Sequence, residues 1–220
     1  MIGETGKVVI IDYQLGNLFS VQQACIHIGL IPEITNDKET IINAKAIILP
    51  GVGAFGNAMK NLEKFDLVMP LKELAASRKP IFGICLGMQL LFEESEEFGK
   101  NKGLGIIAGT IRSFPINYEG KKIKVPHIGW NTIYNNNREW KGTPLEKTKQ
   151  NEFMYFVHSY YAQPSKIDSI LTFTDYCNIN YCSSIISENV FATQFHPEKS
   201  SLKGLEIYRE WANYVKNLVR

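Results

Sequence analysis

The spacing of hydrophobic and polar residues divides this 220-residue chain into two parts. In the first part, short runs of β-branched residues alternate with segments whose hydrophobic residues recur at helical spacing. We expect buried strands at residues 7–12, 31–35, 46–49 and 80–84, and helices at residues 16–28, 66–78 and 88–93. Because strands that alternate with helices form parallel sheets, this part predicts a central, mostly parallel sheet with helices on both faces.

After Gly103 the pattern changes to short segments of alternating residues separated by turn residues. We expect strands at residues 109–114, 121–126, 132–134, 153–163, 169–174 and 181–186, and a loop at residues 135–138. Such segments are typical of antiparallel strands, here added at one side of the core sheet. Residues 201–218 return to helical spacing and predict a final helix. With no repeat or linker, residues 1–220 are expected to form one α/β domain.

Composition excludes several classes of partner. Hydrophobic residues make up 45% of the chain and charged residues 21%, as in an ordinary globular protein. The net charge of +2 gives no electrostatic reason to expect a nucleic acid or membrane partner. The N-terminus lacks a basic segment followed by a long apolar one, and no apolar run approaches the roughly 18 residues that a spanning helix needs. We therefore expect a cytoplasmic protein.

Cysteine and histidine spacing also favours reduced thiols and gives no sign of a metal site. The cysteines, at positions 25, 85, 177 and 182, show no C-x-x-C pair. The histidines, at positions 27, 127, 158 and 196, are too scattered to indicate a metal site. No phosphate-binding P-loop or other nucleotide motif is present, so no cofactor is expected.

Cys85 lies in the segment Gly83-Ile84-Cys85-Leu86-Gly87, between an apolar run and a helix-forming stretch. This order predicts a nucleophile elbow, in which a buried strand turns sharply into a helix and small residues on either side avoid a Cβ clash. The turn would expose the thiol at the helix N-terminus, where unpaired N–H groups and the helix dipole favour the thiolate. A buried structural cysteine in a strand-to-helix corner is the alternative, unless the chain also supplies a base.

A candidate base is His196, in the segment Gln194-Phe195-His196-Pro197-Glu198. Pro197 biases His196 towards an extended conformation, in which residues two apart point to the same side. The Glu198 carboxylate could then lie beside the imidazole, fix its tautomer and stabilise the imidazolium. Cys85, His196 and Glu198 would thus form a nucleophile, base and acid triad. The alternative is a surface histidine followed by a solvated acid.

Several separated motifs together resemble the class I, triad-type glutamine amidotransferases. They are GICLGMQLLF at 83–92, QFHPEKS at 194–200, LPGVGAFG at 49–56 and YFVHSYY at 155–161. Within that class, the chain is similar to the glutaminase subunits of imidazole glycerol phosphate synthase at three further segments: DYQLGNLFSV at 12–21, SEE at 95–97 and KVPHIGWN at 124–131. The motifs run in order from the first strand to the last helix, which makes chance similarity improbable.

The resemblance implies L-glutamine as substrate and a role for each motif. The backbone N–H groups of Val52 and Leu86 would form an oxyanion hole. Without the resemblance, residues 50–53 would be read as an ordinary glycine-rich turn. The glycines would also let this loop reorient between inactive and active forms. Further residues are expected to bind the substrate: Gly51, Gly53, Gln89, Glu97, His158, Ser159 and Tyr160.

The resemblance also implies that the ammonia is used elsewhere, because no acceptor site is visible in this chain. A separate cyclase subunit with a (β/α)8-barrel fold would dock over the active site as the partner in a heterodimer. It would make imidazole glycerol phosphate and an aminoimidazole carboxamide ribotide in histidine biosynthesis. The residues expected at that interface are Asn17, His127, Ile128, Trp130 and Tyr155, although packing within this chain would also explain Ile128 and Tyr155.

Other interpretations remain open at this stage. Residues 181–200 also resemble paralogues that supply ammonia for the amination of surface sugars, and the glutaminase site would be the same in both. A cysteine hydrolase or chaperone of the related elbow-bearing superfamily would share Cys85 but would not need Gln89 or the His-Pro-Glu segment. An inactive scaffold subunit would not need all three triad residues. One departure from the family pattern is Gln14, where the family usually has glycine.

Overall fold

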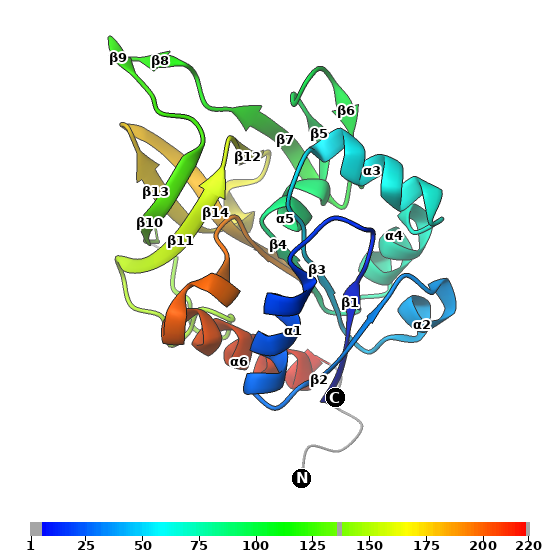
Figure 1. Cartoon of the computed structure of the whole chain (residues 1–220). Coiled ribbons are helices and arrows are strands. Elements are labelled where there is room, and N and C mark those ends of the chain that lie inside the picture. Colours follow the sequence, from blue (N-terminus) through cyan, green and yellow to red (C-terminus); the bar gives the residue numbers. More distant parts are fainter. Residues whose placement is uncertain (1–5, 136–137, 219–220) are drawn as a thin grey trace.

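The computed structural model describes residues 6–135 and 138–218, and it contains a large mixed sheet with helices on both faces (Figure 1). Five strands form its parallel half, in the spatial order β2, β1, β3, β4 and β15. Their bounds are β1 Lys7–Ile11, β2 Ile31–Thr35, β3 Ile47–Leu49, β4 Ile81–Ile84 and β15 Val190–Thr193. The sequence pattern predicted the first four of these strands, and the mostly parallel α/β sheet is confirmed.

The sheet continues with strands from the second part of the chain, as the alternating pattern predicted. Strands β14, β12 and β7 follow β15 in antiparallel order, and β5 and β6 complete the edge. Their bounds are β5 Phe92–Ser95, β6 Asn101–Lys102, β7 Ile107–Ser113, β12 Tyr160–Pro164, β13 Ile170–Tyr176, which pairs with β14, and β14 Ile179–Ser187. Two ribbons stand apart from this sheet: β8 Asn117–Tyr118 with β9 Lys121–Lys122, and β10 His127–Ile133 with β11 Glu152–His158.

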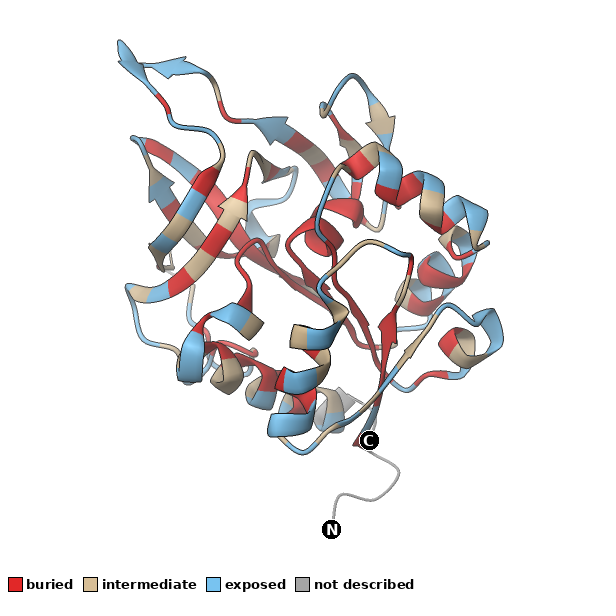
Figure 2. Cartoon of the chain, viewed as in Figure 1, coloured by how far each residue is buried: buried red, intermediate tan, exposed pale blue. Residues whose placement is uncertain are grey.

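Alternate residues of the central strands enter two separate cores. Val9 and Ile11 of β1 face one core, which α2 Lys38–Asn43, α3 Phe55–Lys64 and α4 Val68–Ala76 cover. Val8 and Ile10 face the other, which α1 Leu18–His27 and α6 Ser201–Leu218 cover. Figure 2 shows the central strands almost wholly buried and the β8–β9 ribbon exposed. No helix in the described ranges combines the length and apolar character needed to cross a bilayer.

Several predicted elements differ from the structure. The single strand predicted at residues 153–163 is two strands, because β11 pairs with β10 while β12 joins the main sheet, and the chain changes direction at Ser159. The helix predicted at 88–93 is α5, Leu86–Leu90, which ends early because Phe92 begins β5 and pairs with β7. The strand predicted at 121–126 is limited to β9, and the one at 132–134 belongs to a longer β10 that begins at residue 127.

The pattern did not predict α2, α3 or β15. The short α2 and β15 provide too few residues for a clear period, and α3 begins in a glycine-rich segment. The loop predicted at 135–138 falls partly on residues 136–137, which lie outside the described residues. The final helix has the predicted bounds.

Gln14, the departure from the family pattern, has the backbone conformation that favours glycine. Its φ is 65°, and its N–H donates to Asp12 Oδ1 at 2.9 Å. A residue with a Cβ in this left-handed region costs about 1–2 kcal/mol. The turn after β1 therefore has the backbone conformation expected for a glycine at this position, and Gln14 adopts it with some steric strain.

We predict that Gln14→Gly stabilises the protein by about 0.5–1 kcal/mol, because relief of the left-handed strain exceeds the added entropy of the unfolded chain. Urea denaturation measures the change. The matched control is Gln23→Gly on the exposed side of α1, which should destabilise by about 1 kcal/mol because glycine weakens helices. Equal destabilisation by both substitutions would contradict the prediction.

Candidate functional site

The predicted elbow is present where β4 turns into α5. Cys85 is the N-cap of α5, with φ 53° and ψ −108°, and its N–H donates to Thr193 O of β15 at 2.8 Å. This φ is rare for a residue with a side chain, and strained residues of this kind concentrate at active sites. Gly83 and Gly87 allow the turn, because a Cβ on Gly87 would lie 1.7 Å from Leu49 O and one on Gly83 3.0 Å from Ala192 Cβ.

The predicted base and acid are hydrogen-bonded to each other beside Cys85. His196 Nδ1 lies 2.8 Å from Glu198 Oε1, and both side chains are only 2% exposed. The Cys85 side chain lies close enough to the His196 imidazole to interact with its charge. Because β15 runs parallel to β4, with Thr193 opposite Ile84, the two strands deliver both groups to the same edge of the sheet. The structure therefore brings together all three residues of the predicted triad.

Charge stabilises the protonated imidazole. Burial alone would lower the pKa of His196, but interactions with the nearby Cys85 side chain and the Glu198 carboxylate more than offset it and raise this pKa to about 10. The Glu198 contact fixes the proton on Nδ1, so Nε2 is the atom left for the reaction. In the described residues, His196 Nε2 and Glu198 Oε2 have no hydrogen-bond partner.

Strand β11 holds the loop that carries His196. The His196 N–H donates to Tyr155 O at 2.9 Å, and the Tyr155 N–H donates to Ser200 Oγ at 3.0 Å. Ser200 Oγ in turn donates to His196 O at 2.7 Å. These bonds fix the short segment between β15 and α6, so the base does not depend on side-chain packing alone.

A cleft of about 420 Å³ opens over Cys85. Most of the predicted substrate-binding and oxyanion residues line it: Val52, Gly53, Leu86, Gln89, Glu97, His158, Ser159 and Tyr160. Gly51 is not among the lining residues. Pro126, Val157 and Lys199 also line it and were not predicted from the sequence. Lys199 directly follows Glu198, the triad acid, and this position in the sequence could have indicated that Lys199 lies near the site.

The two predicted oxyanion donors are not both free in this conformation. The Leu86 N–H donates to Gly51 O at 3.3 Å, so the Gly51 carbonyl points to where an oxyanion would lie. The loop is anchored just before this point, because Tyr13 Oη donates to Pro50 O at 2.6 Å. Gly51 cannot carry a side chain here, since its Cβ would lie 1.9 Å from Tyr13 Oη. Rotation of the Gly51–Val52 peptide would exchange this carbonyl for the Val52 N–H.

Glu97 lies in the turn after β5. One of its carboxylate oxygens accepts a hydrogen bond from the Phe55 N–H at the start of α3. Partial burial raises the pKa of Glu97, and the bond to Phe55 opposes this effect. The other oxygen is free of that bond, so the carboxylate could also receive an ammonium group in the cleft.

A buried chain of hydrogen bonds links β10 to the cleft. Tyr181 Oη lies 3.1 Å from both His127 Nδ1 and His158 Nε2, and His158 Nδ1 lies 2.9 Å from Tyr160 O. Since a carbonyl only accepts, His158 must donate from Nδ1 and accept from Tyr181, which accepts from His127 in turn. Burial lowers the pKa of His127 to about 4 and that of His158 to about 3. Both imidazoles are neutral near pH 7, so neither competes with His196 as the base.

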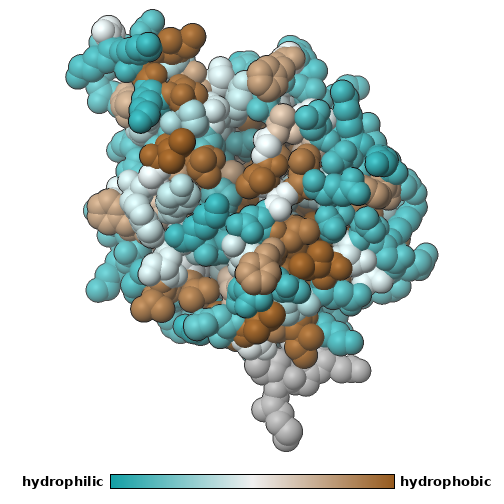
Figure 3. All heavy atoms as spheres, viewed as in Figure 1, coloured by the Kyte–Doolittle hydropathy of each residue, from teal (hydrophilic) through white to brown (hydrophobic). Residues whose placement is uncertain are grey.

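Of the residues predicted at a partner interface, His127 does not lie on the surface. It is 3% exposed, stacks against Phe156 and Tyr176, and places its Nδ1 3.1 Å from Tyr181 Oη. Ile128 and Trp130 are 57% and 54% exposed on β10. Figure 3 shows exposed hydrophobic side chains between polar ones on this view of the molecule.

Of the other two predicted interface residues, Tyr155 is partly buried and Asn17 makes a hydrogen bond within its own helix. Tyr155 is half-buried, with its ring 6.1 Å from Trp130 and with Lys199 Nζ 5.9 Å from its centroid. Asn17 is exposed and caps α1 by accepting from the Ser20 N–H at 3.3 Å.

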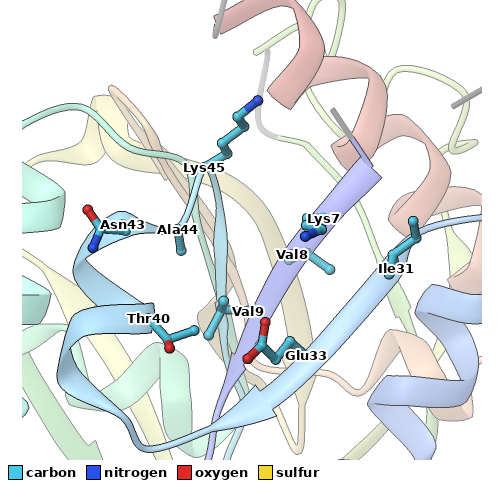
Figure 4. A pocket seen from close by; sticks show the side chains of 9 residues that line it. All are labelled: Lys7, Val8, Val9, Ile31, Glu33, Thr40, Asn43, Ala44 and Lys45. Atoms are coloured by element: carbon cyan, nitrogen blue, oxygen red, sulfur yellow. The ribbon is translucent and has the colours of Figure 1, made fainter. Parts of the chain in front are cut away.

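Another cleft, of about 340 Å³, lies at the amino ends of β1 and β2, the sheet edge opposite Cys85 (Figure 4). Its lining side chains include Lys7, Glu33 and Lys45 but no cysteine or histidine. Of these two clefts, only the one over Cys85 has a cysteine with a histidine beside it.

Comparison with known proteins agrees with this geometry. Residues 9–211 match the family described as glutamine amidotransferase class-I. A curated relative from Aquifex aeolicus, imidazole glycerol phosphate synthase subunit HisH, is 44% identical over 96% of this chain and 99% of its own length. The protein of the same name from Bacillus cereus is 42% identical and is covered over 96% of both chains.

Solved structures at lower identity share the fold. A structure described as a glutamine amidotransferase superposes with a TM-score of 0.71 at 15% identity, covering 94% of this chain and 98% of that one. The PurLQS structure from Thermotoga maritima gives 0.69 at 18% identity, covering 97% of this chain and 99% of that one.

We predict that Gly87→Ala destabilises the protein by about 3 kcal/mol or more and abolishes the reactivity of Cys85, because the new Cβ would overlap the Leu49 carbonyl. Thermal denaturation and thiol alkylation measure the two effects. Gly56→Ala in α3 is the control, since its Cβ would meet only the end of the Asn101 side chain. Near-wild-type stability of Gly87→Ala would show that the elbow is less tightly packed than described.

We also predict a pH dependence from the buried neutral histidines. Because the folded-state pKa of His127, about 4, is below the unfolded value of 6.5, the unfolded state binds more protons between these values and stability falls as the pH falls. His127→Phe should reduce the slope of unfolding free energy against pH by about 1.4 kcal/mol per pH unit in this range. Urea denaturation from pH 4.5 to 6.5 tests this. The carboxylates titrate in both proteins and cancel, so identical slopes would contradict a neutral, buried His127.

Proposed function

The chain belongs to the class I glutamine amidotransferase family, and we propose that Cys85, His196 and Glu198 hydrolyse L-glutamine to supply ammonia to a partner subunit. The observation that carries the proposal is the buried His196–Glu198 pair in contact with a strained Cys85 at the base of a cleft. Glutaminase activity is the function of this family, and the imidazole glycerol phosphate synthase relatives assign it to histidine biosynthesis.

In the first half of the reaction, the Cys85 thiolate attacks the carboxamide carbon of glutamine. The tetrahedral intermediate collapses with cleavage of the C–N bond, and protonated His196 gives its Nε2 proton to the departing nitrogen. Ammonia leaves and a glutamyl thioester remains on Cys85. Glu198 keeps the imidazole in the required tautomer and stabilises its positive charge.

In the second half, His196 removes a proton from water, which attacks the thioester carbon. The C–S bond breaks, glutamate leaves and Cys85 returns to the thiolate beside a protonated His196. The raised pKa of His196 supports this ground state, because a buried thiolate and imidazolium stabilise each other.

The substrate is held by the walls of the cleft. Glu97 offers a carboxylate to the α-ammonium group, and the turn between β11 and β12, at Ser159, offers backbone groups to the amino-acid end. Oxyanion stabilisation requires the Leu86 and Val52 N–H groups. In the described conformation the Gly51 carbonyl occupies the first of these donors, so a peptide rotation at Gly51–Val52 would switch the enzyme on.

A partner subunit is implied by the names of the relatives, each a subunit of imidazole glycerol phosphate synthase. We propose a cyclase with a (β/α)8-barrel fold that docks over the cleft and contacts Asn17, Trp130 and Ile128. The exposure of the latter two supports this surface. Free thiols at all four cysteines support a cytoplasmic location. Protected transfer is required because ammonia released into water near pH 7 is mostly protonated and loses its nucleophilicity.

The acceptor in histidine biosynthesis is favoured over a surface sugar. Relatives of 40–44% identity that carry the imidazole glycerol phosphate synthase name are matched over nearly the whole chain. The elbow-bearing hydrolases and chaperones are set aside by the family match, and an inactive scaffold is disfavoured by the assembled triad.

To test the function, glutamate release is measured for the chain alone, with its cyclase partner, and with partner and acceptor. We expect glutamate release only in the complex, and its rate should rise at least about tenfold when the acceptor binds. In Cys85→Ala the rate should fall by about 10³-fold or more. Cys177→Ser, which changes an exposed cysteine, is the control and should keep full activity.

Two outcomes would contradict the proposal. Glutamate release by Cys85→Ala at the wild-type rate would remove the nucleophile from the mechanism. Equal turnover with and without the partner would refute a gated oxyanion loop while leaving the triad chemistry intact.

A further inference from the structure

One side chain within hydrogen-bonding distance of the Cys85 sulfur belongs to Gln194, for which the sequence predicted no role. Gln194, which follows β15, is fully buried, and its Nε2 lies 3.7 Å from Cys85 Sγ. This distance is within the range of a hydrogen bond to sulfur. The backbone holds the residue in place, since the Gln194 N–H donates to Ser183 O of β14 at 2.9 Å.

The orientation of this amide follows from its neighbours. Gln89 Nε2 lies 2.9 Å from Tyr160 O, and because a carbonyl only accepts, that atom of Gln89 must be the nitrogen. The same nitrogen lies 3.0 Å from Gln194 Oε1, which must therefore be the acceptor. The NH₂ group of Gln194 is then the end that faces Cys85.

These bonds form a directed chain from the wall of the cleft to the nucleophile. Gln89 donates to both Tyr160 O and Gln194 Oε1, and Gln194 donates to Cys85 Sγ. Gln89 and Gln194 are 6% and 0% exposed. A donor at a buried sulfur stabilises the thiolate more than the thiol, because hydrogen bonding to the charged form favours that form.

We propose that Gln194 is a catalytic residue that stabilises the Cys85 thiolate by donating a hydrogen bond to its sulfur, with Gln89 as the residue that positions it. The thiolate then has two supports: the His196 imidazolium supplies charge, and Gln194 supplies a neutral donor. The amide persists when His196 gives up its proton to ammonia, so it also stabilises the sulfur as the leaving group when the thioester is hydrolysed.

This assignment changes the expected role of Gln89. Both hydrogens of its amide are used within the protein, so only its Oε1 remains for glutamine in the cleft. Its main effect is on the reactivity of Cys85, which can be measured without any substrate.

The test is the pH profile of Cys85 alkylation by iodoacetamide in the full chain, in a Cys177→Ser background that removes the exposed thiol. Peptide mass spectrometry follows the modification of Cys85. In Gln194→Leu we expect the apparent pKa of alkylation to rise by about one unit, which slows alkylation about tenfold at pH values below that pKa. In the complex, kcat should also fall, because the amide no longer stabilises the sulfur as the leaving group, while KM for glutamine changes much less.

Two further variants separate this effect from packing. Gln194→Glu keeps the volume and the acceptor for Gln89 but replaces the donor with a carboxylate, so it should raise the pKa further. Gln163→Leu is the matched control, because this amide is exposed on β12 and contacts Arg112. Its alkylation profile should equal that of the background protein. Circular dichroism and thermal denaturation establish that each variant is folded.

A wild-type alkylation profile in folded Gln194→Leu, or in Gln194→Glu where the leucine variant does not fold, would overturn the proposal and leave Gln194 with a packing role. The proposal rests on Cys85 as the nucleophile, but the two can fail separately. If Cys85→Ala kept full glutaminase activity, the proposed function would fail whatever the alkylation profiles show.

Discussion

The parallel pairing of β4 with β15 is the constraint on which the site depends. These strands lie about 110 residues apart in sequence, yet Ile84 and Thr193 are partners at their carboxyl ends. The Cys85 N–H extends the ladder by donating to Thr193 O at 2.8 Å. Because both strands end at the same edge of the sheet, the nucleophile follows one and Gln194, His196 and Glu198 follow the other. The triad is a consequence of strand register.

Around this edge of the sheet, the side chains of His127, His158 and His196 are all buried. The pKa values of these buried histidines shift in opposite directions. Interactions with Cys85 and Glu198 outweigh burial and raise the pKa of His196, whereas burial lowers the pKa values of His127 and His158, and the neighbouring histidines lower that of His158 further. The two neutral histidines and Tyr181 instead hold the turn at Ser159. Both buried networks, this one and the Gln89–Gln194 chain, end on the Tyr160 carbonyl.

Much of the fold and the triad could be predicted from the sequence, because strand and helix periods, the glycines around Cys85 and Pro197 act locally. Features that depend on distant pairing could not. The separation of β11 from β12 depends on which strands each one joins, and the burial of His127 depends on Phe156 and Tyr176 packing on either side. Gln194 was missed for the same reason, since only the β4–β15 pairing places its amide at the Cys85 sulfur. Gln14 shows the opposite situation. The residue type departs from the glycine of the family pattern, but the backbone keeps the left-handed conformation that glycine would adopt.

The central claim is that Cys85 forms a covalent bond with the substrate and that His196 resolves it. The most direct measurement is mass spectrometry of the complex with its partner subunit, acid-quenched during turnover of isotopically labelled glutamine. We predict a labelled glutamyl group on the peptide that contains Cys85 in the wild-type enzyme and no label on the corresponding peptide of Cys85→Ala. Glutamate release by the wild-type complex without any label on Cys85, or with a label on another residue, would contradict the claim.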